Sequence, residues 1–356
     1  MLTRRNNIDR KRIAFGPRFN PGLWLDKYIA GQNGKGEQRN EREVTFKQQL
    51  VGDVAKSRPP VEYTLIFQRW KENIQSLGAN LKSLKIEGRV IVGLGAEAVL
   101  EASVALHRTY GVPYIPGSAL KGLAASYARK ELENDEWRKL KADGEVGKLY
   151  EGVFGSGGKC GYITFHDALY IPPAKDQPQL LHTDVMTVHH PEYYGGDDPP
   201  ADWDDPRPVP FLSATGSYLL ALSGGPGTEG LVGQTMEILA LALRDYGVGA
   251  KTSSGYGRAT LTDPPMTEVE MAAHNLKLHE ESIERRIAEI RSIEGDPKTT
   301  KAQLRDIANR TIEGKKLTET QQKRLAAAIC ERVEDPARPI DVAATQWYPK
   351  IKALAT

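Results

Sequence analysis

Hydrophobic and polar residues along the chain alternate with the period of a β-strand in some segments and with that of a helix in others. Leu84 and Ile86 lie on either side of Lys85 within the segment 81–92, which predicts a half-buried strand. The same alternation predicts strands over residues 112–115, 161–171, 210–222 and 258–262. Strands therefore recur through the middle of the chain.

Apolar residues at helical spacing mark three segments among these strands. Residues 60–77 carry a mixed apolar pattern, and residues 228–246 are apolar almost all round, which predicts a helix buried against a sheet. Between them, a third helix is predicted over residues 118–133. Ser118 directly follows a Pro-Gly pair, so it is the expected N-cap of this helix.

These patterns divide the chain into three regions. Residues 1–80 form an N-terminal region, residues 81–265 a core, and residues 266–356 a helical extension that begins after a pair of prolines. The core is interrupted at about residues 172–210 by an insertion rich in proline and aspartate, where a long loop is expected. The extension contains three charged helical stretches, over residues 268–292, 300–311 and 318–333.

Charge restricts where a nucleic acid can bind. The net charge of +2 over 356 residues is close to neutral, so a nucleic-acid surface requires local clustering of cations. One cluster lies in the first 18 residues, where the only acid is Asp9 and the cations are Arg4, Arg5, Arg10, Lys11, Arg12 and Arg18. This basic arm is either a solvated, flexible segment or an RNA contact, and the sequence leaves both readings open.

The cysteine content and the hydropathy of the sequence indicate the cellular compartment that we expect. Cys160 and Cys330 are far apart, so neither a disulfide framework nor a thiolate zinc site is expected. The basic N-terminus is followed by no apolar segment of the kind found in secretory signals, and the apolar stretches are too short to span a bilayer. We therefore expect a cytoplasmic protein that has no membrane contact, no metal and no cofactor.

Residues 247–258 (GVGAKTSSGYGR), the glycine loop, are the strongest candidate for binding a phosphate. Glycines leave backbone N–H groups open to phosphate oxygens, while cations and hydroxyls supply further donors. The candidate residues are Gly247, Gly249, Lys251, Thr252, Ser253, Ser254, Gly255, Gly257 and Arg258. The loop follows a predicted helix and precedes a strand, the reverse of the order in a nucleoside-triphosphate cradle. The alternative explanation is a tight turn between helix and strand.

A second candidate is the turn before the helix at residues 118–133. Gly117, Ser118 and Lys121 lie where free N–H groups and the positive end of the helix dipole favour an anion. Taken alone, a capped helix with an exposed lysine is the better explanation of this motif.

Residues 115–122 (IPGSALKG) and the glycine loop together resemble the signature of the RAMP superfamily, the repeat-associated RNA-binding subunits of CRISPR effector complexes. Residues 20–28 (NPGLWLDKY) and 184–194 (DVMTVHHPEYY) further resemble the sixth subunit of type III-B (Cmr) complexes. The resemblance covers about residues 15–262, so the helical extension lies outside it.

This resemblance implies an α+β protein with a ferredoxin-like (RRM-like) core. It also implies a subunit without catalytic activity that holds the guide RNA near its 3′ end, contacts target RNA and other RAMP subunits, and takes part in antiviral defence. Base pairing, rather than the protein, then reads the sequence. His189, Tyr193 and Tyr194 of the insertion are candidate RNA contacts, in which the tyrosines stack on bases. Anchoring of the tyrosines to their own domain is the alternative.

Two catalytic readings compete with the binding one. A metal-independent endoribonuclease that processes precursor CRISPR RNA needs a base and an acid, for which His107, His166 and the pair His189-His190 are candidates. A target-RNA-cleaving subunit would instead use a loop aspartate such as Asp184. Asp184 and the histidine pair also suggest a metal site, but their spacing in a proline-rich loop is a weak signal. We predict a binder without enzymatic activity, because lone histidines are more often structural.

Overall fold

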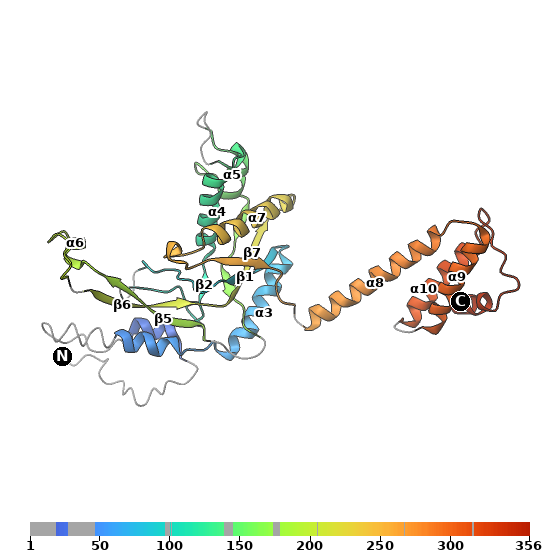
Figure 1. Cartoon of the computed structure of the whole chain (residues 1–356), viewed down its shortest axis with the longest axis horizontal. Helices are drawn as coiled ribbons and strands as arrows, with labels where there is room; N and C mark the ends of the chain where they lie inside the picture. Colours follow the sequence, from blue (N-terminus) through green and yellow to red (C-terminus); the bar gives the residue numbers. More distant parts are fainter. Residues whose placement is uncertain are drawn as a thin grey trace. The chain divides into compact units, whose positions relative to one another are not determined.

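The computed structural model describes residues 19–27, 47–96, 100, 102–138, 145–173, 179–204, 206–266, 268–314 and 317–356. The basic arm predicted at the N-terminus lies outside the described residues, as does the segment 28–46. The chain divides into two compact units, which we call unit 1 (Met1–Pro264) and unit 2 (Pro265–Thr356). Each unit has a hydrophobic core of its own, and Figure 1 shows the elements that form it.

Unit 1 is built on a six-stranded sheet in which every paired strand is antiparallel to its neighbour. The strands are β1 (Asn80–Ile86), β2 (Tyr114–Ile115), β3 (Ile163–Phe165), β4 (Ala168–Tyr170), β7 (Ser217–Gly224) and β8 (Ala259–Thr262). They lie in the order β2-β4-β7-β1-β8, and β3 also pairs with β7. In β7 every residue from 218 to 222 is buried, which means that both faces of the sheet are covered at this strand.

Two helices connect these strands and define the topology. α4 (Gly117–Glu131) comes between β1 and β4 in the chain, α7 (Glu229–Asp245) comes between β7 and β8, and the two helices pack against each other. The resulting order β1-α4-β4-β7-α7-β8, with β4, β7, β1 and β8 side by side, is that of a ferredoxin-like domain. The predicted α+β fold class is therefore confirmed, and both helices lie within two residues of their predicted ends.

The strand predicted over residues 161–171 is interrupted by a β-bulge. Phe165 pairs with Leu222 and Leu169 pairs with Leu219, so four steps along one strand match three along the other. The segment is therefore two short strands, β3 and β4, and one of the two residues between them has no counterpart in β7. This bulge lies beside the N-terminus of α4 and shapes one of the candidate sites.

The insertion folds as a two-stranded hairpin, so the prediction of a long loop is wrong. β5 (Leu181–Val188) and β6 (Arg207–Ala214) pair antiparallel along their whole length, and Figure 1 shows α6 (Pro191–Gly195) at the far end of this insertion hairpin. Pro208 and Pro210 misled the prediction. Proline removes a backbone donor, but an edge strand tolerates it because one side of the strand needs no partner.

Two further predictions, of one helix and one strand, have opposite outcomes. α3 (Val61–Ser76) confirms the helix predicted over residues 60–77, and the Tyr63 hydroxyl on its buried face donates a hydrogen bond to the Tyr170 carbonyl at 2.6 Å. The single strand predicted over residues 210–222 is wrong. It is divided between β6, which pairs with β5, and β7, which pairs with β1.

The described part of unit 2 contains four helices and no strand. Its helices are α8 (Glu268–Ser292), α9 (Pro297–Glu313), α10 (Glu319–Val333) and α11 (Trp347–Ala355). The first three confirm the predicted helical stretches, whereas α11 was missed because nine residues show too little periodicity. Across the described residues of the whole chain, no helix has both the length and the apolar character needed to cross a membrane.

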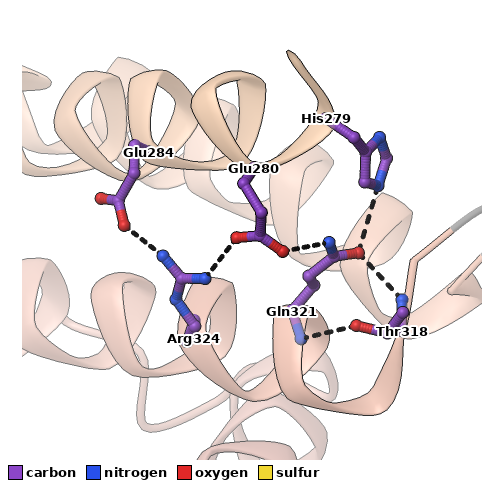
Figure 2. A network of polar contacts seen from close by, with 6 residues as sticks. All are labelled: His279, Glu280, Glu284, Thr318, Gln321 and Arg324. Carbon is purple, nitrogen blue, oxygen red and sulfur yellow. Dashed lines mark hydrogen bonds and ion pairs between the residues drawn. The ribbon is translucent and has the colours of Figure 1, made fainter. Parts of the chain in front are cut away.

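An apolar stripe and a polar network join α8 to α10. Ile283, Ile287 and Ile290 are buried in the core of unit 2 together with residues of α10. Figure 2 shows the network, in which Arg324 contacts Glu280 at 2.7 Å and also pairs with Glu284. Because such surface ion pairs add little stability, the isoleucine stripe is the main reason why α8 packs here.

Candidate nucleic-acid interface

The glycine loop, residues 247–258, connects α7 to β8 as predicted and is hydrogen-bonded to the chain segment that follows β1. The Ala250 N–H donates to the Ile91 carbonyl at 2.7 Å, and the Gly257 N–H donates to the Arg89 carbonyl at 2.8 Å. These bonds hold both arms of the loop on the core of unit 1.

Three of the four glycines in the loop are needed for this close packing. A Cβ on Gly247, Gly249 or Gly257 would lie between 2.0 and 2.9 Å from backbone atoms, and all three have φ between 75° and 92°. Gly255, with φ 87°, has open space around its Cβ position. The tight-turn explanation therefore accounts for most of the glycines that suggested a phosphate site.

Arg258 contacts the helix that precedes the loop. Its Nη1 donates to the Arg244 carbonyl at 2.7 Å, at the C-terminal end of α7, where a cation also interacts favourably with the helix dipole. This cap joins residues 14 positions apart, and the sequence pattern gave no sign of it.

The remaining candidates of the loop lie at its tip. Lys251 has φ 56°, a left-handed conformation that is uncommon for a residue with a side chain, and Thr252–Ser254 form a single turn of 3-10 helix. The Lys251 carbonyl accepts hydrogen bonds from the N–H groups of Ser254 and Tyr256, which fixes this conformation. Residues 253–255 are exposed and Lys251 is half-buried. The tip therefore presents hydroxyls, N–H groups and one ammonium from a fixed backbone.

Asp184, the candidate aspartate for RNA cleavage, lies in β5 rather than in a loop. Its carboxylate accepts hydrogen bonds from Arg89 Nη1 and Ser213 Oγ, each at 2.6 Å, and from the hydroxyl of Tyr256 in the glycine loop. Burial raises the pKa of Asp184, but these three hydrogen bonds outweigh it and hold the pKa below its ordinary value. The carboxylate is thus a fixed anion that joins the insertion hairpin to the glycine loop.

The N-terminus of α4, the second candidate site, is occupied by a carboxylate of the protein itself. Pro116 is the N-cap and no side chain caps the helix from within, so the prediction that Ser118 is the N-cap is wrong. Instead Asp167, which lies in the β-bulge, accepts a hydrogen bond from the Gly117 N–H at 2.8 Å. A Cβ on Gly117 would lie 2.0 Å from the Phe165 carbonyl oxygen, so glycine allows the helix to start against the bulge.

The two polar residues of this turn remain open to solvent. Ser118 is exposed and Lys121 is half-buried on the first turn of α4. A phosphate bound here would meet the negative charge of Asp167, which already occupies the favourable position at the helix end. The geometry therefore favours the capped-helix explanation of the motif.

The histidine candidates for an endoribonuclease have structural hydrogen bonds. His107 Nδ1 accepts from the Thr109 N–H at 3.3 Å, and His166 Nε2 lies 2.8 Å from Ser223 Oγ. Burial lowers the pKa of both imidazoles below the ordinary value, and the nearby carboxylate of Asp167 only partly offsets this effect. Both rings are therefore neutral at pH 7.

Residues 20–27, the described part of the motif NPGLWLDKY, contain α1 (Pro21–Lys27) and contribute to the wall of a cavity. Asn20 Oδ1 accepts from the Leu23 N–H at 3.0 Å, while its Nδ2 donates to the carbonyls of Arg108 and Thr109 at 2.9 and 3.0 Å. The cavity beside α1 has a volume of about 920 Å³, and the charged residues in its lining are Asp26, Lys27, Arg108 and Asp167. Because two acidic residues balance two basic residues, the cavity does not select for an anion. His107 also lines this cavity.

The far end of the insertion hairpin carries exposed aromatic rings. Tyr193 and Tyr194 are 52% and 73% exposed, and Trp203 is 88% exposed. His190 Nδ1 lies 2.7 Å from Asp204 Oδ2, and this contact joins the two ends of the segment between β5 and β6. The exposure of the rings favours stacking on a ligand over anchoring to their own domain.

The weak metal signal in this insertion is not supported by the geometry. His190 pairs with Asp204 and Asp184 pairs with Arg89, while His189 is exposed to solvent. Among the residues described, no three His, Cys, Asp or Glu side chains gather as ligands of a metal ion.

Comparison with known protein sequences identifies a family and two relatives. Residues 83–260 match the family model of the RAMP superfamily. The chain is 31% identical over 273 residues to the CRISPR system Cmr subunit Cmr6 of Pyrococcus furiosus, a match that covers 62% of this chain and 80% of that protein. It is 23% identical over 183 residues to the CRISPR system CMR subunit Cmr6 of Saccharolobus solfataricus, covering 48% of this chain and 57% of that protein.

Solved structures give weaker three-dimensional matches. A cryo-EM structure of the type III-B Cmr-beta bound to cognate target RNA matches with a TM-score of 0.49 and 21% identity, over 66% of this chain and 78% of that chain. The crystal structure of Cmr6 from Pyrococcus furiosus matches with a TM-score of 0.35 and 32% identity, over 52% of this chain and 98% of that chain. The family assignment therefore rests on sequence.

Proposed function

The chain belongs to the RAMP superfamily, and from this membership we propose that it is a non-catalytic RNA-binding subunit of a type III-B CRISPR RNA-guided effector complex. In this role it holds the guide RNA near its 3′ end, contacts target RNA and other RAMP subunits, and takes part in antiviral defence. The 31% identity to a Cmr6 subunit, over 80% of that protein, supports the assignment to this complex.

The exposed tip of the glycine loop is the observation that carries the RNA-binding part of the proposal. Lys251 is not ion-paired with any described carboxylate, and the hydroxyls of residues 252–254 and the N–H groups of residues 252 and 253 lie beside it. The backbone that carries them is held by the hydrogen bonds to residues 89–91 and by the contact of Tyr256 with Asp184. Donors that are already fixed lose little conformational entropy when a phosphate binds.

The insertion hairpin supplies a second type of contact. Tyr193, Tyr194 and Trp203 present aromatic faces to solvent at its far end, where a base of the guide or target strand can stack on them. Stacking is tolerant of base identity, because every base has a π-face. This tolerance fits a subunit that leaves sequence reading to base pairing.

The non-catalytic part of the proposal is supported by the hydrogen bonds that the candidate catalytic side chains already make. RNA cleavage without a metal requires a base and an acid within reach of the reacting oxygens. Asp184 has three hydrogen-bond donors around its carboxylate, and His107 and His166 each have a structural partner. One feature favours an endoribonuclease, since His107 and Asp167 line the same cavity, and this alternative needs a direct test.

The RNA-binding part is tested by the variant Lys251→Ala in the full chain, with Lys148→Ala as the matched control. Lys148 is an exposed lysine on α5 (Lys148–Phe154), and none of its atoms belongs to the candidate site. Binding of a single-stranded guide RNA is measured over a salt series. We expect Lys251→Ala to weaken binding equally for unrelated sequences and to lower the salt slope by roughly 0.7, the loss of one phosphate contact. Wild-type affinity at physiological salt would mean that the loop is only a turn.

The non-catalytic part is tested by incubating the full chain with a repeat-containing precursor RNA and with a target RNA, each with and without EDTA. We expect no defined product in any of the four reactions. A site-specific product refutes this part of the proposal. Its loss in His107→Ala would identify the endoribonuclease alternative, and its loss in Asp184→Asn the aspartate alternative.

A further inference from the structure

Unit 2 contains a groove between α9 and α11, which we call the α9–α11 groove. Its volume is about 750 Å³, and both of its walls belong to unit 2. It lies outside residues 83–260, the part of the chain that matches the RAMP family, so that match assigns no role to it.

The groove is lined by cations from both walls. Lys298, Lys301 and Arg305 recur on α9 at spacings of three and four residues, which places them on one face of the helix. Lys350 contributes a fourth cation from α11. At about 1.5 Å per residue, the three cations of α9 extend over roughly 10 Å along the helix axis.

Few carboxylates oppose these cations. Glu313 is the acidic residue in the groove lining, and Arg305 lies 3.5 Å from Asp306 in an exposed pair of little strength. In the described part of the chain, Lys298 and Lys350 have no ion pair. The groove therefore concentrates positive charge, whereas Arg324 outside it is paired with Glu280 and Glu284. Cations held together in this way favour a ligand with several negative charges.

The neutral residues of the groove indicate what kind of anion fits. Asn309, Gln346 and Thr345 offer amide and hydroxyl donors, which bind phosphate and sugar oxygens. Trp347 is only 7% exposed, so its ring belongs to the core of unit 2 and not to a docking surface. Protein partners are usually held by large apolar or aromatic anchors, and the groove presents none that is exposed. A phosphodiester backbone therefore fits better than an acidic protein segment.

We propose that the α9–α11 groove binds the phosphodiester backbone of an RNA strand. The three cations of α9, spread over roughly 10 Å, can each pair with a phosphate of the strand. The choice of RNA rests on the function proposed for unit 1, whereas the preference for a phosphate chain follows from the groove itself. The chain then contacts nucleic acid through two separate units.

The test compares two variants of the full chain, each of which replaces three cations of unit 2 with glutamine. The groove variant is Lys298→Gln, Lys301→Gln, Arg305→Gln. The control variant is Lys277→Gln, Arg286→Gln, Lys323→Gln, at exposed positions outside the groove lining. Both variants lose the same charge, so a difference between them reports position and not net charge. Lys350→Gln, on the other wall, is a milder single change for use if the groove variant folds poorly.

Binding of a fluorescent single-stranded RNA is measured over a salt series. We expect the groove variant to bind about tenfold more weakly at physiological salt and its salt slope to fall by roughly 2, because about three phosphate contacts are lost. The control variant should bind within about twofold of wild type. Equal binding by the groove and control variants overturns the proposal.

Two comparisons separate the remaining outcomes. Poly-glutamate serves as a probe for an acidic protein segment. If the full chain binds poly-glutamate and the groove variant does not, while the groove variant still binds RNA as wild type does, then the occupant is an acidic protein segment and the RNA assignment is overturned. If Lys251→Ala binds RNA normally while the groove variant does not, the groove inference holds and the proposal for the glycine loop fails. The reverse result overturns the groove and leaves the glycine loop as the RNA contact.

Discussion

Replacing Gly249 with alanine should destabilise unit 1 more than replacing Gly255 in the same way. Both glycines have positive φ, 92° and 87°, so each alanine bears the cost of a left-handed conformation, roughly 1–2 kcal/mol. Only at position 249 would the new Cβ meet an atom of the protein, 2.1 Å from the Ile91 carbonyl oxygen. The loop must then move away and lose the Ala250 to Ile91 hydrogen bond, which adds about 1 kcal/mol. The expected losses are therefore about 2–3 kcal/mol for Gly249→Ala and 1–2 kcal/mol for Gly255→Ala.

Hydrogen exchange is the appropriate assay, because amides in β1 and β8 report on unit 1 separately from unit 2. The free energy of opening for these amides is compared between the two variants and wild type. RNA binding is measured on the same samples, and Gly255→Ala should affect it directly, since that residue lies at the exposed tip. If Gly249→Ala costs no more than Gly255→Ala, close packing is not the reason for glycine at position 249.

Two further predictions concern the insertion hairpin. Asp184→Asn should destabilise unit 1 at pH 7, because hydrogen bonds hold the pKa of Asp184 below its ordinary value. A depressed pKa stabilises the folded state above the unfolded-state pKa of about 3.9, and this stability is lost as pH falls through the folded pKa. The difference between variant and wild type should therefore shrink below about pH 4, as urea unfolding at pH 7 and pH 3 will show. Tyr194→Ala should weaken RNA binding by about 1–3 kcal/mol at an unchanged melting temperature, because the ring is 73% exposed; binding titrations check the first effect and calorimetry the second.

Elements with a long, regular pattern were predictable from the sequence. α8 spans the residues predicted for it, and α7 differs from its prediction by one residue at each end, because many turns of helix repeat the same apolar spacing. The position of the glycine loop between a helix and a strand was also predictable. The insertion hairpin was not, because prolines argue against a strand unless the strand is known to lie at an edge.

Contacts between residues far apart in the chain could not be predicted from the sequence, yet they determine which residues of the candidate sites are already engaged. Asp167 caps a helix that begins 50 positions earlier, and it does so because a bulge shifts the register between β4 and β7 by one residue. Tyr256 meets Asp184 only once the insertion hairpin has folded against the glycine loop. Neither contact leaves a periodic or spacing signal. Local patterns therefore located the candidate segments, but they did not show which of their residues were already engaged.

In both parts of the RAMP signature, several residues make contacts that stabilise the fold. Gly117 lets α4 start against the bulge, and three glycines of the loop at residues 247–258 let it lie against residues 89–91. Asp167 occupies the N-terminal end of α4, where a phosphate would otherwise bind, and Arg258 is engaged as a cap at the C-terminal end of α7. Within this signature, the part left for the RNA contact that we propose is a short tip around Lys251, which carries donors for phosphates but no arrangement suited to reading base edges. Binding through such a surface would be independent of sequence, which agrees with the proposed function, in which base pairing by the guide discriminates between RNAs.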